Sequence, residues 1–349
     1  MKRRSFIRTA GSLAGGMALS AESLSAAAKE MQGAPTSFER PMPTRQLGNT
    51  GEKISLIGFP GNGLRLHSEK DSIELIHKSI DRGVNFYDVS PRYGKDGECE
   101  IKMGIGLEGK RDQVFLASKT VMRDAAGARQ QLETSLKRLK TDHLDLYQMH
   151  FFQTIKEVEE AFAPGGVMEL MAQAKEEGKI RYIGFSAHTT LSALEAMNRF
   201  SFDTVMFPVS FVEHFTFGFG QAVLELAHSQ GVSVIGIKST SGGSWSDSVP
   251  KEDRKGHWFR MIEEEPAIGM ALRFALSQKA VITTVPASSP LSLDRAIPVA
   301  CNYVPVSKEE LKALHQIAKS SNPLFLEWQN RALMGHSENT DDFDENIMC

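Results

Sequence analysis

The chain has 349 residues, of which 41% are hydrophobic and 24% charged, and its formal net charge is −3. This is the composition of an ordinary globular protein, and a pI of about 6.4 implies no basic face for nucleic acid. Cys99, Cys301 and Cys349 form no CxxC pair, which excludes a cysteine-held zinc or iron–sulfur site and a disulfide framework.

The N-terminus resembles a twin-arginine export signal. A basic segment, 2–8, contains two adjacent arginines and is followed by a weakly apolar run, 9–20, and by small residues at 25–28 that offer a cleavage site. The apolar run is too short to span a membrane. We therefore expect residues 1–28 to be a signal peptide that engages the twin-arginine (Tat) export machinery, and the mature protein to be periplasmic or otherwise exported.

A linker, a globular region and a tail are expected to follow. Residues 29–42 contain prolines and glycines but few apolar residues, which indicates a linker. The region 43–335 begins with a Gly/Asn turn between two extended arms within 45–58, which predicts a β-hairpin. The acidic segment 336–349 is predicted to be a flexible tail.

Near-continuously apolar segments alternate with amphipathic helical ones from residue 54 onward. The expected strands are 54–59, 84–88, 114–119, 144–150, 181–186, 203–208, 232–238 and 281–285. The clearest helical patterns are 71–81, 125–140, 189–200, 221–230 and 266–277. Such strands are typical of a parallel sheet covered on both faces. Eight strand-then-helix units in about 250 residues favour an α/β fold, a (β/α)8 TIM barrel, with an open doubly wound sheet as the alternative.

The connections between these elements are unequal. The long segment 239–265 is expected to cover the site. The helix after the fourth strand is interrupted at 164–166, which predicts two pieces, and 308–320 and 324–332 are predicted to form a C-terminal helical extension. Residues 104–109 spell G-x-G-x-x-G but end a helix instead of opening one, so they are interpreted as a helix end and turn.

Polar residues end four successive expected strands. They are Asp88, Lys119, His150 and Ser186, and Tyr93 lies just beyond the first of these strand ends. In a barrel of this kind the chemistry sits at the C-terminal ends of the strands. A carboxylate at the end of a buried strand is costly without a positive partner, so Lys119 is the expected partner of Asp88. Each residue alone has a structural explanation, but together at one rim they predict an active site.

The residue types fit the reduction of a carbonyl. A phenol is a weak acid, with an ordinary pKa of about 10, and the ammonium of Lys119 would stabilise the phenolate of Tyr93. Asp88 would keep that lysine charged and oriented. His150 would hold the substrate oxygen while Tyr93 protonates it and hydride arrives at carbon. Because no side chain supplies hydride, the chemistry implies a nicotinamide cofactor.

The chain resembles the aldo-keto reductase family over nearly all of 43–300. The matching stretches are 45–57, 83–94, 98–120, 132–150, 178–186 and 231–238. Asp88, Tyr93, Lys119 and His150 stand where the family has its catalytic Asp-Tyr-Lys-His tetrad. The resemblance implies a (β/α)8 barrel, a hairpin that plugs its bottom, and NADPH-dependent interconversion of carbonyls and alcohols.

The resemblance also implies a set of cofactor-binding residues. Ser186 matches the serine that touches the nicotinamide amide, and Lys238 follows the position of a stacking aromatic. Pro286, Ser288 and Ser289 lie in a turn that resembles the phosphate-binding turn, and a helix N-terminus there suits an anion. The remaining two candidates, Gly61 and Asn62, follow the first strand and are expected near the cofactor ribose or the substrate.

Several positions depart from the family's cofactor pattern. Ala187 stands where asparagine is usual, Met206 where glutamine is usual, and Ile237 where an aromatic often stacks. The basic residues for a 2′-phosphate are replaced by Ala287 and Leu293. The cofactor is therefore expected to be NADP(H) or NAD(H), without a choice between them.

Phe59, Phe151 and Trp245 are expected to contact substrate, an aldehyde, ketone or sugar carbonyl. His188 and His214 fall near the same rim, but no third ligand is evident and no metal site is predicted. Two rival hypotheses remain. One is a non-catalytic nucleotide- or carbohydrate-binding protein on the same scaffold, and the weaker one is a metal-dependent barrel isomerase.

Overall fold

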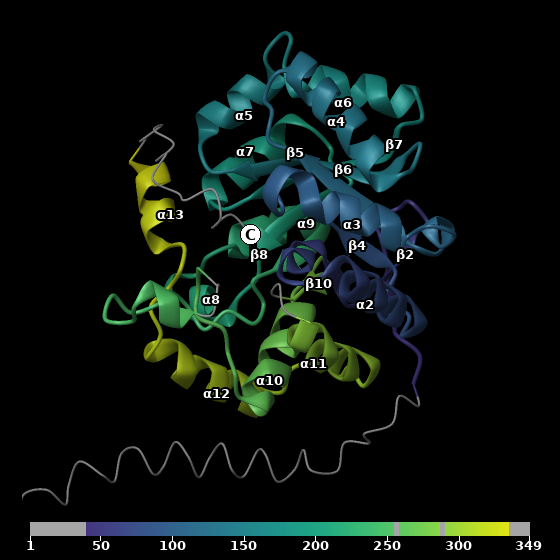
Figure 1. Ribbon diagram of the computed structural model, residues 1–349. Coiled ribbons are helices and arrows are strands. Elements are labelled where there is room, and N and C mark those ends of the chain that lie inside the picture. The colour runs from purple at the N-terminus through teal and green to yellow at the C-terminus, as the bar shows by residue number, and fades with distance from the viewer. Residues whose placement is uncertain (1–39, 255–257, 287–289, 335–349) are drawn as a thin grey trace, which may run out of the picture.

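Eight parallel strands form one sheet that curls into a barrel in the computed structural model (Figure 1), which describes residues 40–254, 258–286 and 290–334. The strands are β3 (Gly58–Pro60), β4 (Phe86–Asp88), β5 (Phe115–Thr120), β6 (Leu144–Phe152), β7 (Ile180–Ala187), β8 (Thr204–Pro208), β9 (Ser233–Ile237) and β10 (Val281–Val285). They are hydrogen-bonded in chain order from β3 to β10. A parallel bridge between Ile57 and Thr284 joins the first strand to the last. The predicted (β/α)8 barrel is thereby confirmed.

A two-stranded antiparallel hairpin precedes the barrel. It consists of β1 (Thr44–Gln46) and β2 (Lys53–Ser55). Arg45 in β1 donates to the carbonyls of Leu276 and Val281, at 2.7 and 2.6 Å, and so fixes the hairpin to the start of β10. The predicted first barrel strand, 54–59, was wrong at its beginning, because residues 54 and 55 pair with β1 and the barrel strand starts at Gly58.

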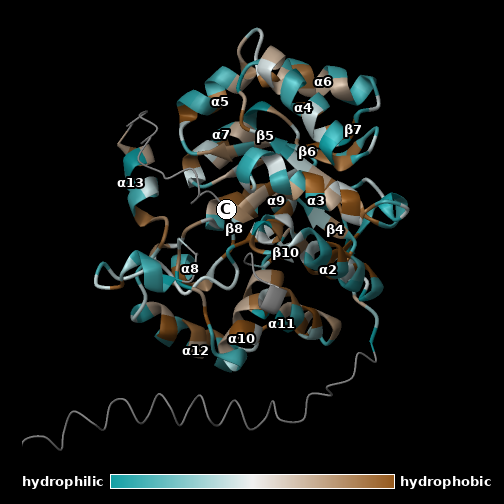
Figure 2. Ribbon diagram, in the orientation of Figure 1, coloured by the Kyte–Doolittle hydropathy of each residue, from teal (hydrophilic) through white to brown (hydrophobic). Residues whose placement is uncertain are grey.

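Helices surround the sheet. They are α2 (Glu69–Asp81), α3 (Glu98–Gly106), α4 (Ala125–Leu139), α5 (Ile155–Phe162), α6 (Val167–Glu176), α7 (Thr190–Arg199), α8 (Phe211–Phe217), α9 (Gln221–Gln230), α10 (Glu265–Leu276), α11 (Pro290–Cys301), α12 (Lys308–Lys319) and α13 (Leu326–Leu333). Short 3₁₀ helices span Gly61–Leu66, Lys95–Gly97, Arg111–Gln113 and Lys251–Arg254. In Figure 2 most of these helices carry both hydrophilic and hydrophobic residues, as helices with one buried side do.

Two details of the helix predictions are confirmed. The helical segment after β6 is divided into α5 and α6 by residues 163–166, as predicted. Thr154, the residue before α5, caps this helix in a capping box with Glu157, a feature that was not predicted. The G-x-G-x-x-G sequence ends α3 at Gly106 and precedes β5, so it opens no dinucleotide-binding helix.

The core has an inner and an outer part. Side chains inside the barrel form one cluster, made of Leu47, Ile54, Phe86, Phe115, Ala117, Leu146, Met206, Ile235, Ile282 and Val285. The larger cluster lies between the strands and the helices. Because side chains alternate along a strand, Phe86 belongs to the inner cluster and Tyr87 to the outer one. The inner cluster fills the barrel interior, and the polar ends of the strands stand at its C-terminal mouth.

The C-terminal extension runs back over the molecule. Helix α12 packs on α8 and α10, and α13 packs on α7. In Figure 1 these two helices are the yellow ones, and α13 lies on the same side of the barrel as α5 and α7. The connection between them, 320–325, therefore passes from the side of the barrel toward its mouth.

Candidate active site

Asp88, Tyr93 and Lys119 form one hydrogen-bonded network at the mouth of the barrel. The ammonium of Lys119 donates to Asp88 Oδ2 at 2.6 Å and to Tyr93 Oη at 2.8 Å. It also donates to the carbonyl of Val89 at 3.1 Å. Lys119 is fully buried, so these three acceptors take the place of water around its charge. The ammonium is held against the phenol oxygen.

Strand pairing positions these groups. Asp88 in β4 pairs with Ala117 in β5, which places the carboxylate next to the end of the strand that carries Lys119. Tyr93 follows in a turn whose backbone is closed by its own N–H, which donates to the Ser90 carbonyl at 3.0 Å. Lys119 in turn pairs with Gln148, two residues before His150. Three neighbouring strands thus deliver the four predicted catalytic residues to one place.

His150 lies at the other side of the phenol. Its ring is 6.0 Å from the Tyr93 ring, at an interplanar angle of 75°. Its Nδ1 is 3.3 Å from Ser90 Oγ, and Arg123 donates to its carbonyl at 2.8 Å. Burial, together with the nearby charge of Lys119, lowers the pKa of His150 well below its ordinary value. The imidazole is therefore neutral and can donate a hydrogen bond to a substrate oxygen.

Asp88 is the acid of the network. Burial raises the pKa of its carboxyl, and the charge and hydrogen bond of Lys119 oppose that rise. Asp88 Oδ2 is bonded by Lys119, but within the described residues Asp88 Oδ1 has no hydrogen-bond partner. A buried carboxylate oxygen of this kind can accept a hydrogen bond from the hydroxyl of a bound ligand.

The predicted cofactor residues differ in how near they lie to the network. Ser186 Oγ accepts from the N–H of Phe151 at 2.7 Å, which leaves its own hydrogen free to be donated. Lys238 is buried with a left-handed backbone, φ +59°, and its charge lowers the pKa of Asp88, so it lies near the network. Asn62 is buried after β3. Pro286 is buried at the end of β10, whereas the other two residues of the predicted phosphate turn, 288 and 289, lie outside the described residues.

Gly61 has a packing role. A Cβ at this position would lie well inside contact distance of the Asp88 carbonyl oxygen and would also crowd the Val89 side chain. The end of β3 therefore approaches the end of β4 more closely than any other residue type would allow. This explains the glycine without a cofactor.

Of the three predicted substrate residues, the structure brings only Phe151 to the tetrad. The Phe151 ring is 6.2 Å from the His150 ring. Phe59 instead belongs to the outer core cluster and stacks on Tyr87 at 5.0 Å, so its ring lies between sheet and helices. Its prediction failed because β3 is buried on both faces, and an apolar sequence does not show which face a side chain takes.

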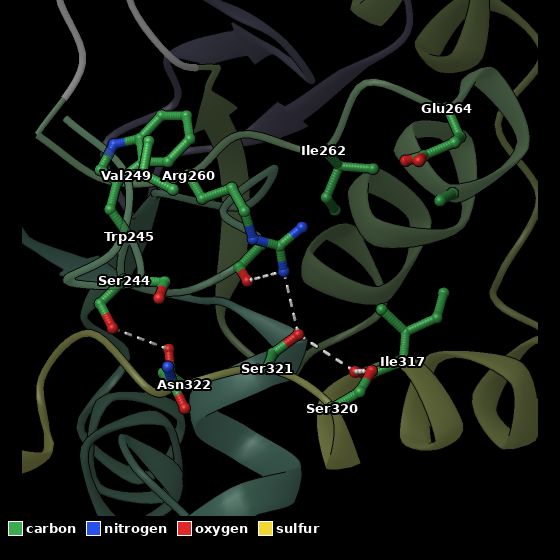
Figure 3. A pocket seen from close by; sticks show the side chains of 13 residues that line it. Ser244, Trp245, Val249, Arg260, Ile262, Glu264, Ile317, Ser320, Ser321 and Asn322 are labelled. Carbon is green, nitrogen blue, oxygen red and sulfur yellow. Dashed lines mark hydrogen bonds between the residues drawn. The ribbon is translucent and has the colours of Figure 1, made fainter. Parts of the chain in front are cut away.

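Trp245 lines a separate cavity of about 410 Å³. Figure 3 shows this cavity between the segment after β9 and the end of α12, with Trp245 and Arg260 from the first and Ser321 from the second. No tetrad residue is among those that line it. The prediction that Trp245 lines the site around Tyr93 is therefore not supported by its position.

The same view shows how the segment after β9 is attached to the C-terminal extension. The N–H of Ser244 donates to the Asn322 carbonyl at 2.8 Å, and Arg260 bonds both the Gly242 carbonyl and, at 3.2 Å, the Ser321 hydroxyl (Figure 3). Further along, the Trp258 and Trp328 rings stack 6.0 Å apart at 7°. The two segments thus form one cover, and Trp258 and Trp328 are the part of this cover that lies toward the mouth of the barrel.

Four further aromatic rings lie around Phe151, and two of them, Phe325 and Trp328, were not identified from the sequence. We call these five residues the mouth cluster; its members are Phe151, His188, Trp258, Phe325 and Trp328. His188 follows β7 two residues after Ser186, and that spacing places both on one side of the strand and was a usable signal. Phe325 and Trp328 come from the far end of the chain, and nothing in the local sequence connects them with Phe151.

The fold and the network together define a class, the carbonyl-reducing oxidoreductases built on a (β/α)8 barrel. The chain matches the model of the aldo/keto reductase family over residues 58–319 and belongs to that family. Among the described residues no group of three His, Cys, Asp or Glu side chains is placed to hold a metal ion. In the same residues no helix is both long and apolar enough to cross a membrane.

Individual relatives agree with this assignment. Aldo-keto reductase YhdN of Bacillus subtilis (strain 168) is 41% identical over 157 residues, which cover 40% of this chain and only 45% of that protein. The uncharacterized oxidoreductase YqkF of the same organism is 24% identical over 309 residues, 80% of this chain and 97% of that protein.

Solved structures show the same fold. The holo form of aldo-keto reductase AKR11C1 from Bacillus halodurans has a TM-score of 0.65 at 23% identity, and the match covers 82% of this chain and 99% of that one. The aldo/keto reductase from Klebsiella pneumoniae, in complex with NADP and acetate, has a TM-score of 0.58 at 20% identity and covers 81% and 96%.

Proposed function

We propose that this protein reduces an aldehyde, ketone or sugar carbonyl to an alcohol, or catalyses the reverse reaction, with a nicotinamide cofactor and with Tyr93 as the general acid. The observation that carries the proposal is the 2.8 Å hydrogen bond from the buried ammonium of Lys119 to the Tyr93 hydroxyl. A positive charge at that distance stabilises the phenolate that remains after proton transfer. The tyrosine is thereby suited to give its proton to a substrate oxygen near neutral pH.

The other side chains hold the reactants. The neutral imidazole of His150 donates a hydrogen bond to the carbonyl oxygen, which then lies between His150 and Tyr93. Asp88 keeps the ammonium in place through their 2.6 Å ion pair. Tyr93 transfers its proton to the oxygen as charge develops there. When bound, a nicotinamide supplies the hydride.

The residues around the network suit such a cofactor. Asp88 Oδ1 is buried and, within the described residues, without a partner, so it can accept from a ribose hydroxyl. The Ser186 hydroxyl can donate to a carboxamide oxygen, because its acceptor side is already taken by the Phe151 N–H. The NADP complex of the Klebsiella pneumoniae enzyme supports a nicotinamide nucleotide. NADP(H) and NAD(H) both stay in the proposal.

We further infer that the protein is exported. The twin-arginine-like sequence in residues 1–28 supports this inference, although it lies outside the described residues. That export route carries folded proteins, so the protein would leave the cytoplasm with a tightly held cofactor. Fractionation of cells that express the full chain tests the location, and release of a nucleotide from the denatured exported protein tests the cofactor.

A Tyr93→Phe variant tests the reaction itself. The variant removes one hydroxyl, so NADPH or NADH should still quench or shift protein fluorescence on binding, while reduction of a panel of carbonyls falls at least a hundredfold. Tyr182→Phe is the matched control, because the Tyr182 hydroxyl contacts Glu52 at the hairpin end of the barrel. Nucleotide binding without any Tyr93-dependent reduction would instead favour a non-catalytic binding protein.

A further inference from the structure

His188 is a buried imidazole whose two ring nitrogens have no hydrogen-bond partner in the described part of the chain. It is only 6% exposed, and within the described residues neither Nδ1 nor Nε2 makes a hydrogen bond. Buried polar groups in folded proteins are nearly always hydrogen-bonded, and each exception calls for a physical explanation. The His188 backbone, by contrast, is well bonded, since its N–H donates to the Phe152 carbonyl at 2.9 Å. The strand end is thus fixed and the ring is held in one place.

Three aromatic rings lie around the His188 side chain. The Phe151 ring lies 4.5 Å away at 82°, the Phe325 ring 5.4 Å away at 22°, and the Trp328 ring 5.5 Å away at 61°. A phenylalanine would fill this space without leaving two polar atoms desolvated. Packing alone therefore gives no reason for a histidine here.

The position of His188 relative to the reacting groups supplies a reason. Phe151 lies between the two imidazoles, 6.2 Å from the His150 ring and 4.5 Å from the His188 ring. Lys238 belongs to the same region, since its ammonium lies 5.4 Å from the centre of the Trp258 ring, which stacks on Trp328 beside His188. A substrate whose carbonyl oxygen is held at His150 would lie against the Phe151 ring, whose other neighbour is His188.

The backbone of Phe151 supports the same arrangement. Phe151 has φ +68°, a left-handed conformation that bulky residues rarely adopt. The Ser186 hydroxyl accepts from its N–H at 2.7 Å and stabilises this conformation. Backbone strain of this kind persists where surrounding structure holds it, and it concentrates at ligand sites. Here it places the Phe151 ring between His150 and His188.

We propose that His188 determines substrate specificity by hydrogen-bonding a hydroxyl group on the carbons beyond the reacting carbonyl, with Phe151 contacting the C–H groups between them. The substrate class is then a hydroxylated aldehyde or ketone. This inference rests on the proposed reduction, which His150 and Tyr93 perform. A site built to bond a hydroxyl discriminates against an analogue that lacks it, because the polar group of the protein is then left unpaired.

Paired substrates and a His188→Phe variant test the assignment. D-erythrose and butanal share a carbon number and differ in hydroxyl groups, as do D-glyceraldehyde and propanal. In the variant, kcat/KM for the hydroxylated member of each pair should fall about tenfold to a hundredfold relative to the other member. His188→Gln should recover part of that ratio, since an amide can also bond a hydroxyl.

The stability of the His188→Phe variant is a second readout. If the role of His188 were purely structural, replacing it would lower the stability of the protein. Because His188→Phe removes two unpaired nitrogens, the unfolding midpoint of the ligand-free variant should stay level or rise. His214→Phe is the matched control. The sequence placed His214 near the same rim, but its half-buried ring packs against Phe215 and against Phe274 of α10, so the variant should leave the substrate ratios unchanged.

The outcomes separate this inference from the proposed function. Equal loss on both members of a pair, or a lowered unfolding midpoint for His188→Phe, would overturn the role of His188 while the Tyr93 result stands. If the wild-type protein reduces no carbonyl, the role of His188 can still be tested by calorimetry, which measures the binding of erythritol and of butanol to the wild type and to His188→Phe. Tighter erythritol binding by wild type than by His188→Phe supports the role of His188, and equal binding contradicts it.

Discussion

Lys119 Nζ lies 2.6 Å from Asp88 Oδ2, and the two side chains are only 0% and 5% exposed. A charge pair this deeply buried depends on both members, because neither is solvated by water. The same ammonium contacts the Tyr93 hydroxyl. One buried ion pair therefore serves stability and, in the proposed reaction, proton transfer from Tyr93.

Replacing Lys119 by methionine should lower both the stability of the protein and its activity. The Asp88 carboxyl would be left buried without its counter-ion, which lowers the free energy of unfolding by about 3–5 kcal/mol. Urea unfolding measures this loss. The double variant Asp88→Asn/Lys119→Met should recover part of it, and Lys70→Met, at an exposed surface pair, should leave the midpoint unchanged. A double variant as unstable as the single one would show that the pair is not coupled.

Stability should fall as the pH drops below about 6.5. Burial lowers the pKa of His150 and His188 well below the ordinary value, so both stay neutral when folded while the unfolded chain takes up protons near pH 6.5. The unfolded state then binds more protons, and the loss approaches about 1.4 kcal/mol per pH unit for each histidine.

A comparison of the wild type with His188→Phe isolates one of these contributions. The variant should lose less stability between pH 7 and pH 5.5, as followed by urea unfolding at each pH. Burial raises the pKa of Asp88, so this residue changes the pH dependence of stability in the opposite direction. Its contribution is the same in both proteins and cancels in the comparison. Identical slopes for the two proteins would mean that His188 takes up its proton as readily in the folded protein as in the unfolded chain.

Gly61→Ala should impair folding and reaction through the same displacement. The new Cβ would overlap the Asp88 carbonyl oxygen, and moving the end of β4 shifts the carboxylate that orients Lys119. We expect a loss of about 1–3 kcal/mol in unfolding free energy and a lower kcat. Gly236→Ala in β9 is the control, because its Cβ would meet its nearest atom at an ordinary 3.5 Å. Equal effects of the two substitutions would contradict this explanation.

Gly243→Ala should detach the segment after β9 from the C-terminal extension. Gly243 has φ +98°, and a Cβ there would overlap the Asn322 carbonyl oxygen. Limited proteolysis between residues 244 and 254 should become faster, and KM should rise. Gly51→Ala imposes a similar strain at φ +87°, but no described atom lies within 4 Å of its Cβ. Unchanged proteolysis in Gly243→Ala would show that the tether does not hold the segment.

The proximity of the proposed catalytic residues was predictable because parallel strands end at one edge. Asp88, Lys119 and His150 close neighbouring apolar strands, and strand order alone brings such ends together. The local pattern placed Tyr93 in the loop just beyond Asp88, its residue type suggested the proton donor, and the resemblance then matched all four residues to one tetrad. The 2.6 and 2.8 Å contacts of Lys119 agree with the roles inferred from residue types.

The surroundings of the tetrad were not predictable for two physical reasons. Strands buried on both faces carry no alternation, so the outward direction of Phe59 could not be read. Phe325 and Trp328 meet Phe151 only through the path of the C-terminal extension, a contact between distant parts of the chain. The position of Trp245 depends likewise on how the segment after β9 meets residues 320–322.

The joint cover has a consequence for engineering. The residues proposed to carry the chemistry lie between 88 and 150, whereas the cover is built from segments after residue 238 that bond each other through Ser244 and Asn322. A graft of new specificity from another barrel must therefore exchange both segments at once. If only one of the two segments were transplanted, it would lack the segment that it contacts here. The recipient's site would then be left uncovered, and the new specificity would not be gained.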